Sequence, residues 1–222
     1  MELLHLTTSD NIKLAGNYFP VSPSKQLSRN GWVVFLHMMP ATKESWTILA
    51  SQLQQEGYAG LAIDLRGHGI SDGGPKGYTQ FSDAEHQDSV RDVDAAIDFL
   101  TGLGARPEQI IFIGASIGAN LALQYVYQHR AFKKAILLSP GFNYHGIAVQ
   151  PIVSQMPSDK QLFYIASEDD VDTTNSAEVE SLYALTSCAI KQKEIVADGG
   201  HGSAILTHHP ELIDEIITFI KQ

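Results

Sequence analysis

The hydrophobic residues of this chain form short apolar runs that alternate with segments in which apolar residues recur every three or four positions. Continuous runs indicate strands buried on both faces, and the helical spacing indicates amphipathic helices. The expected strands are Trp32–Leu36, Ala59–Ile63, Ile110–Ile113, Ala135–Leu138, Leu162–Ala166 and Gln192–Val196. The expected helices are Glu44–Gln55, Val90–Leu100, Ala119–His129, Ala177–Thr186 and Leu212–Ile220. This alternation predicts a mainly parallel sheet with helices on both faces.

The amino-terminal region has a different pattern. Leu3–Thr7 and Ile12–Phe19 are expected to be strands joined by a turn at Ser9–Asn11, with no helix between them. They therefore predict an antiparallel edge on the sheet. Pro20–Asn30 is polar and is expected to be a surface loop, and no linker separates two cores. We expect one α/β domain over residues 1–222.

Composition and charge exclude several classes of function. The formal net charge is −10 and no basic run offsets it, which disfavours binding to nucleic acid or to an anionic membrane surface. Cys188 is the single cysteine, so neither an intrachain disulfide nor a cysteine-rich metal site is expected. We see no secretory signal and no apolar segment of about 20 residues, and we expect a cytoplasmic protein.

The sequence Gly114-Ala115-Ser116-Ile117-Gly118 carries the strongest chemical signal. A buried strand is expected directly before it and a helix directly after it. A serine on such a sharp turn projects its hydroxyl above the edge of the sheet, and the glycines relieve crowding of the backbone. The positive end of the helix dipole also points at this position. Ser116 is therefore the candidate nucleophile.

A serine hydroxyl needs a base to become a nucleophile at neutral pH. His201 lies in a glycine-rich segment just after the last expected strand, at the same sheet edge as Ser116. The imidazole in turn needs an acid, and the strand Leu162–Ala166 is followed by acidic residues. Asp170 is the first choice because it is far enough past the strand to turn toward His201. The other candidates, in order of preference, are Asp172 and Asp169.

These residues and their chain order resemble the α/β-hydrolase superfamily, and the resemblance extends from Ile12 to Ile220. The matching motifs are Phe35-Leu36-His37, Asp64-Leu65-Arg66-Gly67-His68-Gly69-Ile70-Ser71, Gly114 to Gly118, the acid Asp170, and Gly200-His201-Gly202. Family members usually have His-Gly at the first of these motifs, whereas this chain has His37-Met38. The resemblance implies an α/β-hydrolase fold and a serine nucleophile that needs no cofactor or metal.

The resemblance also implies an oxyanion hole made of two backbone N–H groups. One belongs to the loop after His37 and is assigned to Met39, with Met38 as the second choice. The other is that of Ile117. The six residues from Asp64 to Gly69 fit no phosphate-binding motif and are interpreted as a structural turn.

The segment 140–161 stands where many family members carry a helical cap. Its length and three prolines leave room for a loop and one short helix, which predicts an open site. Phe142 and Tyr144 either line an acyl or alcohol pocket or merely cover the sheet. Met38 either lines the pocket or packs in the core. We expect substrate contacts from these three residues and from His37.

The leading hypothesis is a serine carboxylesterase that acts on small to medium acyl esters. A thioesterase or a small peptidase would use the same three residues. A protein of this fold that binds ligands without turnover is the alternative from another class. The sequence leaves the natural substrate and the oligomeric state open.

Overall fold

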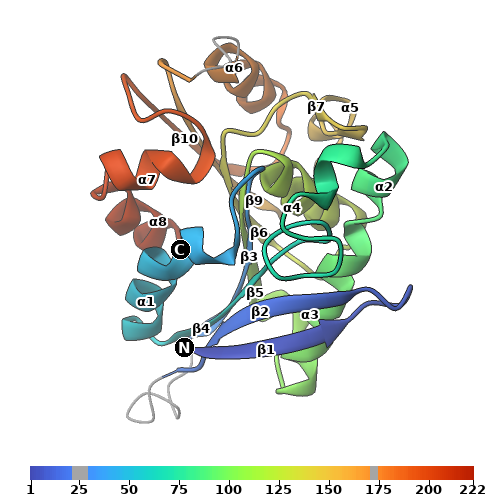
Figure 1. The fold of residues 1–222 in the computed structure, drawn as a ribbon. Helices are drawn as coiled ribbons and strands as arrows, with labels where there is room; N and C mark the ends of the chain where they lie inside the picture. The colour runs from blue at the N-terminus through green and yellow to red at the C-terminus, as the bar shows by residue number, and fades with distance from the viewer. Residues whose placement is uncertain (22–29, 171–174) are drawn as a thin grey trace.

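A single eight-stranded sheet runs through the protein (Figure 1). The structure is a computed structural model, and it describes residues 1–21, 30–170 and 175–222. The strand order is β1-β2-β4-β3-β5-β6-β9-β10. The strands are β1 (Glu2–Thr7), β2 (Lys13–Phe19), β3 (Gly31–Leu36), β4 (Tyr58–Ile63), β5 (Ile110–Ala115), β6 (Lys134–Leu138), β9 (Gln161–Ser167) and β10 (Ile190–Val196).

The directions of the strands confirm the expected fold class. All pairs from β4 to β10 are parallel, whereas β2 is antiparallel to both β1 and β4. The first two strands thus form the antiparallel edge that the missing helix between them predicted. Most of the expected surface loop, residues 22–29, lies outside the described residues.

Helices cover both faces of the sheet (Figure 1). α3, α4 and α6 pack in one apolar cluster, and α1 and α8 pack in the other. β3 supplies both clusters, because Val34 faces the first and Val33 and Phe35 face the second. The α-helices are α1 (Thr47–Gln55), α2 (Asp83–Gln87), α3 (Val90–Gly102), α4 (Ile117–Gln128), α5 (Gln150–Val153), α6 (Asn175–Leu185), α7 (Ile205–His208) and α8 (Leu212–Ile220). The 3₁₀ helices are η2 (Lys43–Trp46), η3 (Gly77–Gln80), η4 (Pro107–Gln109) and η5 (Gly202–Ala204).

Segment 140–161 contains a small hairpin and the single turn α5. The hairpin pairs β7 (Asn143–Tyr144) with β8 (Ile147–Ala148). Its two turn residues, His145 and Gly146, have φ values of 50° and 81°. That pair of positive φ values matches a tight hairpin turn of the primed type. The β7–β8 hairpin is too short to show a strand pattern in the sequence.

A buried ion pair anchors the loop that follows β4. The Lys43 Nζ and backbone N–H groups both donate to the carboxylate of Asp64, each at 2.8 Å, and Ile70 N–H donates to it at 3.1 Å. Burial alone would lower the pKa of Lys43, but hydrogen bonds to Asp64 and Glu44 outweigh it and raise that pKa. A Cβ on Gly69 would lie 2.1 Å from Asp64 Oδ2, so the loop closes tightly around the carboxylate. The expected structural turn over 64–69 is thus built around one buried charge.

Removing the lysine from this pair should be costly. We expect Lys43→Met to lower the free energy of unfolding by about 3 kcal/mol or more, because it leaves the buried Asp64 carboxylate without its cation. The measurement is urea unfolding followed by circular dichroism. The control is Lys133→Met, which breaks the exposed pair with Asp159 and should cost less than about 1 kcal/mol. Equal losses in the two variants would contradict the assigned role of Lys43.

Candidate active site

Ser116 occupies a sharp turn between β5 and α4. Its backbone has φ 52° and ψ −120°, a region that residues other than glycine rarely adopt. The turn is held because Ser116 N–H donates to Leu138 O at 2.8 Å, at the end of β6. The serine is therefore placed at the carboxyl edge of the parallel strands, as the motif predicted.

The two glycines of the motif allow three segments of the backbone, from β3, β5 and α4, to approach one another closely at this turn. A Cβ on Gly114 would lie 2.2 Å from Gly118 O, and a Cβ on Gly118 would lie 2.3 Å from Leu36 O. Both distances are far below a van der Waals contact, and the atoms met belong to the backbone. Residues 114 and 118 therefore have to be glycine if α4 is to start this close to β3 and β5.

His201 and Asp170 are hydrogen-bonded to one another. His201 Nδ1 lies 2.6 Å from Asp170 Oδ2, and the Asp170 side chain is fully buried. Asp170 follows β9, His201 follows β10, and both loops lie at the same sheet edge as Ser116. Asp169 instead binds a backbone N–H, and Asp172 lies outside the described residues. Of the described acids after β9, Asp170 is the one that contacts the imidazole.

The histidine loop also packs against the serine turn. A Cβ on Gly202 would lie 3.3 Å from Ala115 Cβ and 2.6 Å from Met38 Sδ. The residues next to His201 and Ser116 are thus in contact. No hydrogen bond joins Ser116 Oγ to His201 among the described residues, and the Ser116 side chain stands at the start of α4.

Backbone donors at the serine turn are available for a ligand. Ile117 N–H opens α4, and neither it nor the N–H groups of Met38 and Met39 bind another atom of the described chain. The first turn of a helix leaves such N–H groups unpaired and adds the positive end of its dipole. Met39 and Ile117 therefore remain the predicted oxyanion donors, with Met38 as the second choice.

His37 was expected to contact substrate, but the structure places its ring beneath the surface with 0% exposure. Its Nε2 accepts the Leu65 N–H at 3.0 Å, so its Nδ1 carries the proton and donates to Met38 O at 2.9 Å. Burial, and then the neighbouring His68, lower the pKa of His37 to about 4. We therefore interpret His37 as a neutral residue that fixes the loop carrying Met38 and Met39.

The β7–β8 hairpin brings Tyr144 to the histidine. The Tyr144 ring stands edge-on to the His201 ring, with centroids 6.4 Å apart. Phe142 and Met38 are each half-buried against the core, on either side of the sheet. Tyr144 is thus the aromatic residue of the hairpin that contacts the candidate base, and substrate contacts by these three residues remain predictions.

Sequence analysis missed a residue that fixes this hairpin. Asn120 is fully buried on α4, one turn after Ser116. Its Nδ2 donates to Gly141 O and Ile147 O, both at 2.9 Å, and its Oδ1 accepts Gly141 N–H at 3.1 Å. A polar residue on the buried face of a helix was the available signal.

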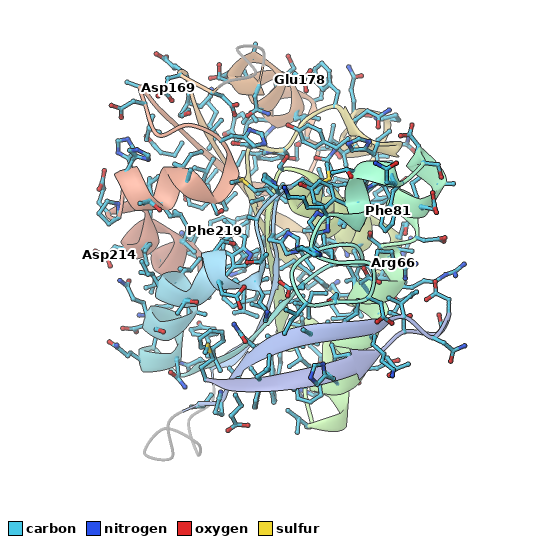
Figure 2. The ribbon with its side chains drawn as sticks, viewed as in Figure 1. Arg66, Phe81, Asp169, Glu178, Asp214 and Phe219 are labelled. Carbon is cyan, nitrogen blue, oxygen red and sulfur yellow. The ribbon has the colours of Figure 1, made fainter. Side chains whose placement is uncertain are left out.

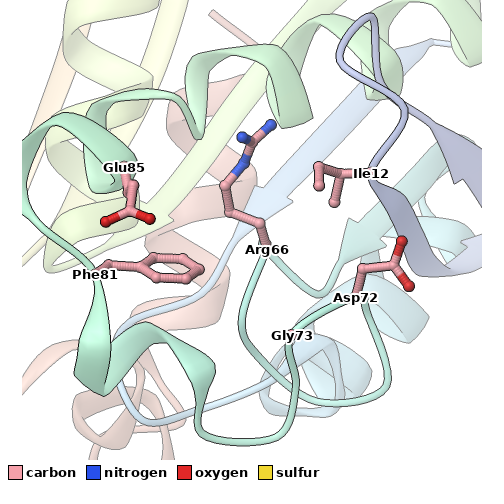
Figure 3. Close-up of a pocket in the computed structure, with 6 residues that line it drawn as sticks. All are labelled: Ile12, Arg66, Asp72, Gly73, Phe81 and Glu85. Atoms are coloured by element: carbon pink, nitrogen blue, oxygen red, sulfur yellow. The ribbon is translucent and has the colours of Figure 1, made fainter.

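The pocket drawn in Figure 3 is lined by none of these residues. It has a volume of about 210 Å³ and is lined by Ile12, Arg66, Asp72, Gly73, Phe81 and Glu85. Arg66 is held there by Asp92 and Asp10, each at 2.8 Å. The hydrogen bond from Arg66 holds the pKa of Asp10 well below its ordinary value, and burial raises that of Asp92 to about 6. The guanidinium therefore serves the structure of the loop.

Among residues 1–21, 30–170 and 175–222, no group of three or more His, Cys, Asp or Glu side chains is arranged to hold a metal ion. No helix in the described part of the chain has the length and apolar character needed to cross a bilayer.

The strand order, the serine turn and the acid and histidine loops define an α/β hydrolase. The sequence profile of the family described as serine aminopeptidase, S33 matches residues 28–201, and the chain belongs to that family.

Individual relatives agree with this assignment. The AB hydrolase superfamily protein YisY of Bacillus subtilis is 30% identical over 109 residues, which make up 48% of this chain and 37% of that protein. The uncharacterized protein Mb2734 of Mycobacterium bovis is 27% identical over 110 residues, or 49% of this chain and 29% of that protein. The aligned segments span about a third of the length of these relatives.

Solved structures share the fold over almost the whole chain. The Pyrococcus furiosus esterase Pf2001 superposes with a TM-score of 0.78 and 20% identity, covering 99% of this chain and 91% of that one. The esterase RhEst1 from Rhodococcus sp. superposes with a TM-score of 0.76 and 16% identity, covering 100% and 99%. The shared fold therefore extends over almost the whole of this chain and of these two structures.

The close backbone approach at the serine turn gives a direct test. We expect Gly118→Ala to lower the free energy of unfolding by about 1–3 kcal/mol or more, because the added methyl meets backbone atoms. The matched control is Gly102→Ala at the end of α3, where a Cβ meets nothing within 4 Å. Gly102→Ala should leave the free energy of unfolding unchanged or raise it by up to about 1 kcal/mol. Urea unfolding measures both, and a neutral Gly118→Ala would refute the assigned packing.

Proposed function

We propose that this protein is a serine hydrolase that cleaves carboxylic esters of small to medium size through an acyl-enzyme intermediate. The observation that carries the proposal is the 2.6 Å hydrogen bond between His201 Nδ1 and the buried Asp170, at the sheet edge where Ser116 stands on its strained turn. The buried carboxylate fixes the tautomer in which Nε2 is free to accept a proton. Esterases with the same fold support the choice of ester substrates.

Acylation begins when His201 Nε2 accepts the proton of Ser116 Oγ and the oxygen attacks the ester carbonyl carbon. This step requires a Ser116–His201 hydrogen bond to form with substrate in place. The carbonyl electron pair moves onto oxygen, where the N–H groups of Met39 and Ile117 stabilise the negative charge. The intermediate then collapses, the bond to the alcohol oxygen breaks, and His201 returns its proton to that oxygen.

Deacylation repeats these steps with water as the nucleophile. His201 accepts a proton from water, the hydroxide attacks the acyl carbon, and the bond to Ser116 Oγ breaks. The proton on His201 then restores the Ser116 hydroxyl, and the free acid leaves. The chemistry uses side chains and backbone N–H groups of this chain and needs no metal or organic cofactor.

The family description favours a peptidase as the second candidate, and a thioesterase would use the same groups. Initial rates on nitrophenyl esters, acyl-CoA thioesters and aminoacyl nitroanilides rank the three activities. We expect the highest kcat/KM on short nitrophenyl esters. A higher value on nitroanilides would replace the esterase proposal with the peptidase.

An active-site probe separates an enzyme from a ligand-binding protein of this fold. A fluorophosphonate should label the wild-type protein, and peptide mapping should place the label on Ser116. Ser116→Ala should not be labelled, because the nucleophilic oxygen is gone. Ser181→Ala, which removes an exposed serine of α6, should be labelled like the wild type. A folded wild-type protein that resists labelling would contradict the proposed function.

Neutralising the buried acid tests its role. We expect Asp170→Asn to lower kcat by about 10²–10⁴-fold, because the amide no longer holds the imidazole in the required tautomer. Steady-state hydrolysis of a nitrophenyl ester measures the loss, and the thermal midpoint verifies folding. The control Glu168→Gln changes an exposed acid two positions away and should keep full activity. Near-full turnover in Asp170→Asn would show that the acid is another residue.

A further inference from the structure

Three side chains outside the proposed triad bind backbone atoms of the two glycines that flank His201. Asp169 Oδ1 accepts the Gly200 N–H at 2.9 Å, and the Ser167 hydroxyl donates to Gly200 O at 2.6 Å. On the other side, Ser139 Oγ accepts the Gly202 N–H at 2.9 Å. The backbone is therefore held immediately before and immediately after the candidate base.

The loop needs such contacts because its own sequence does not define its shape. Gly199, Gly200 and Gly202 have φ values of 133°, 70° and 59°, which only glycine adopts without strain. Glycine also loses the most conformational entropy when it is ordered. Without outside contacts, the segment around His201 would populate many conformations and the imidazole would move with it.

Two of the three side chains that bind this loop lie at the ends of strands. Ser139 follows β6 directly, and Ser167 is the last residue of β9; both side chains are buried. Asp169 is exposed and lies at the outer rim of the molecule (Figure 2). The hydrogen bond from the Gly200 N–H lowers the pKa of Asp169, so that it is an anion at neutral pH. Two strand ends thus supply fixed points for the loop after β10.

We propose that Asp169, Ser167 and Ser139 are positioning residues that hold His201 in reach of both Asp170 and Ser116. This inference rests on the proposed function. Asp170 orients the ring through Nδ1, whereas these three residues fix the backbone from which the ring extends. Because an error of about 1 Å in the position of a catalytic group can cost about 10²-fold in rate, the effect should appear in kcat.

Asp169 offers the sharpest test because it is exposed and its loss leaves no cavity. We expect Asp169→Ala to lower kcat about 10- to 100-fold with KM changed less than about twofold. Asp169→Asn keeps an oxygen that accepts the Gly200 N–H, so it should restore kcat to within about threefold of the wild type. The matched control is Glu168→Ala, whose side chain makes no hydrogen bond in the described chain and should have no effect. Thermal midpoints of all variants should agree within a few degrees.

A second measurement does not depend on turnover. Hydrogen–deuterium exchange over residues 199–204 should be faster in Asp169→Ala than in the wild type, and unchanged in Asp169→Asn and Glu168→Ala. Full kcat and unchanged exchange in Asp169→Ala would overturn the proposal. Loss of activity in Asp169→Asn equal to that in Asp170→Asn would overturn it too, by making Asp169 an acid of the reaction. Failure of the fluorophosphonate to label the wild type would instead refute the proposed function and leave the exchange result standing.

Discussion

The structure depends on a backbone crossing that has no room for side chains. At the start of α4, Gly118 lies against the backbone of Leu36, and Gly114 lies against Gly118 itself. Between these two contacts, Ser116 is held with positive φ by its hydrogen bond to the end of β6. β3, β5, β6 and α4 therefore meet at one point, and the packing of these elements maintains the strain at the serine. The same crossing brings the loop after β3 close to the start of α4, where Ile117 lies.

Several buried charged residues stabilise the loops near this crossing. Lys43 and Asp64 form a buried pair, and Arg66 binds two aspartates. These groups shape the loop after β4, and His37 connects that loop to the one after β3 through its two ring nitrogens. The polar groups near the sheet edge thus include a set that fixes the loops around the serine turn and takes no part in the proposed triad.

The fold could be predicted from the sequence because each parallel strand except the edge strand β10 is a largely apolar run and most of the longer helices have an apolar stripe. The position of Ser116 and His201 at one edge of the sheet could be predicted because glycines surround both and each follows a strand. The choice among the acids after β9 could not be settled, since Asp169 and Asp170 are neighbours and only their direction distinguishes them: one points to a backbone N–H and the other to the imidazole. Asn120 and the β7–β8 hairpin were missed because their contacts join residues more than 20 positions apart or depend on a single turn.

Asn120 holds the β7–β8 hairpin entirely through main-chain atoms of Gly141 and Ile147. Hydrogen bonds to main-chain atoms do not depend on which side chains lie between Gly141 and Ile147. Phe142 can therefore be exchanged for other side chains while the path of the hairpin over the serine helix is preserved. Evolution, or an engineer, can alter the side chain at position 142 without rebuilding the framework underneath.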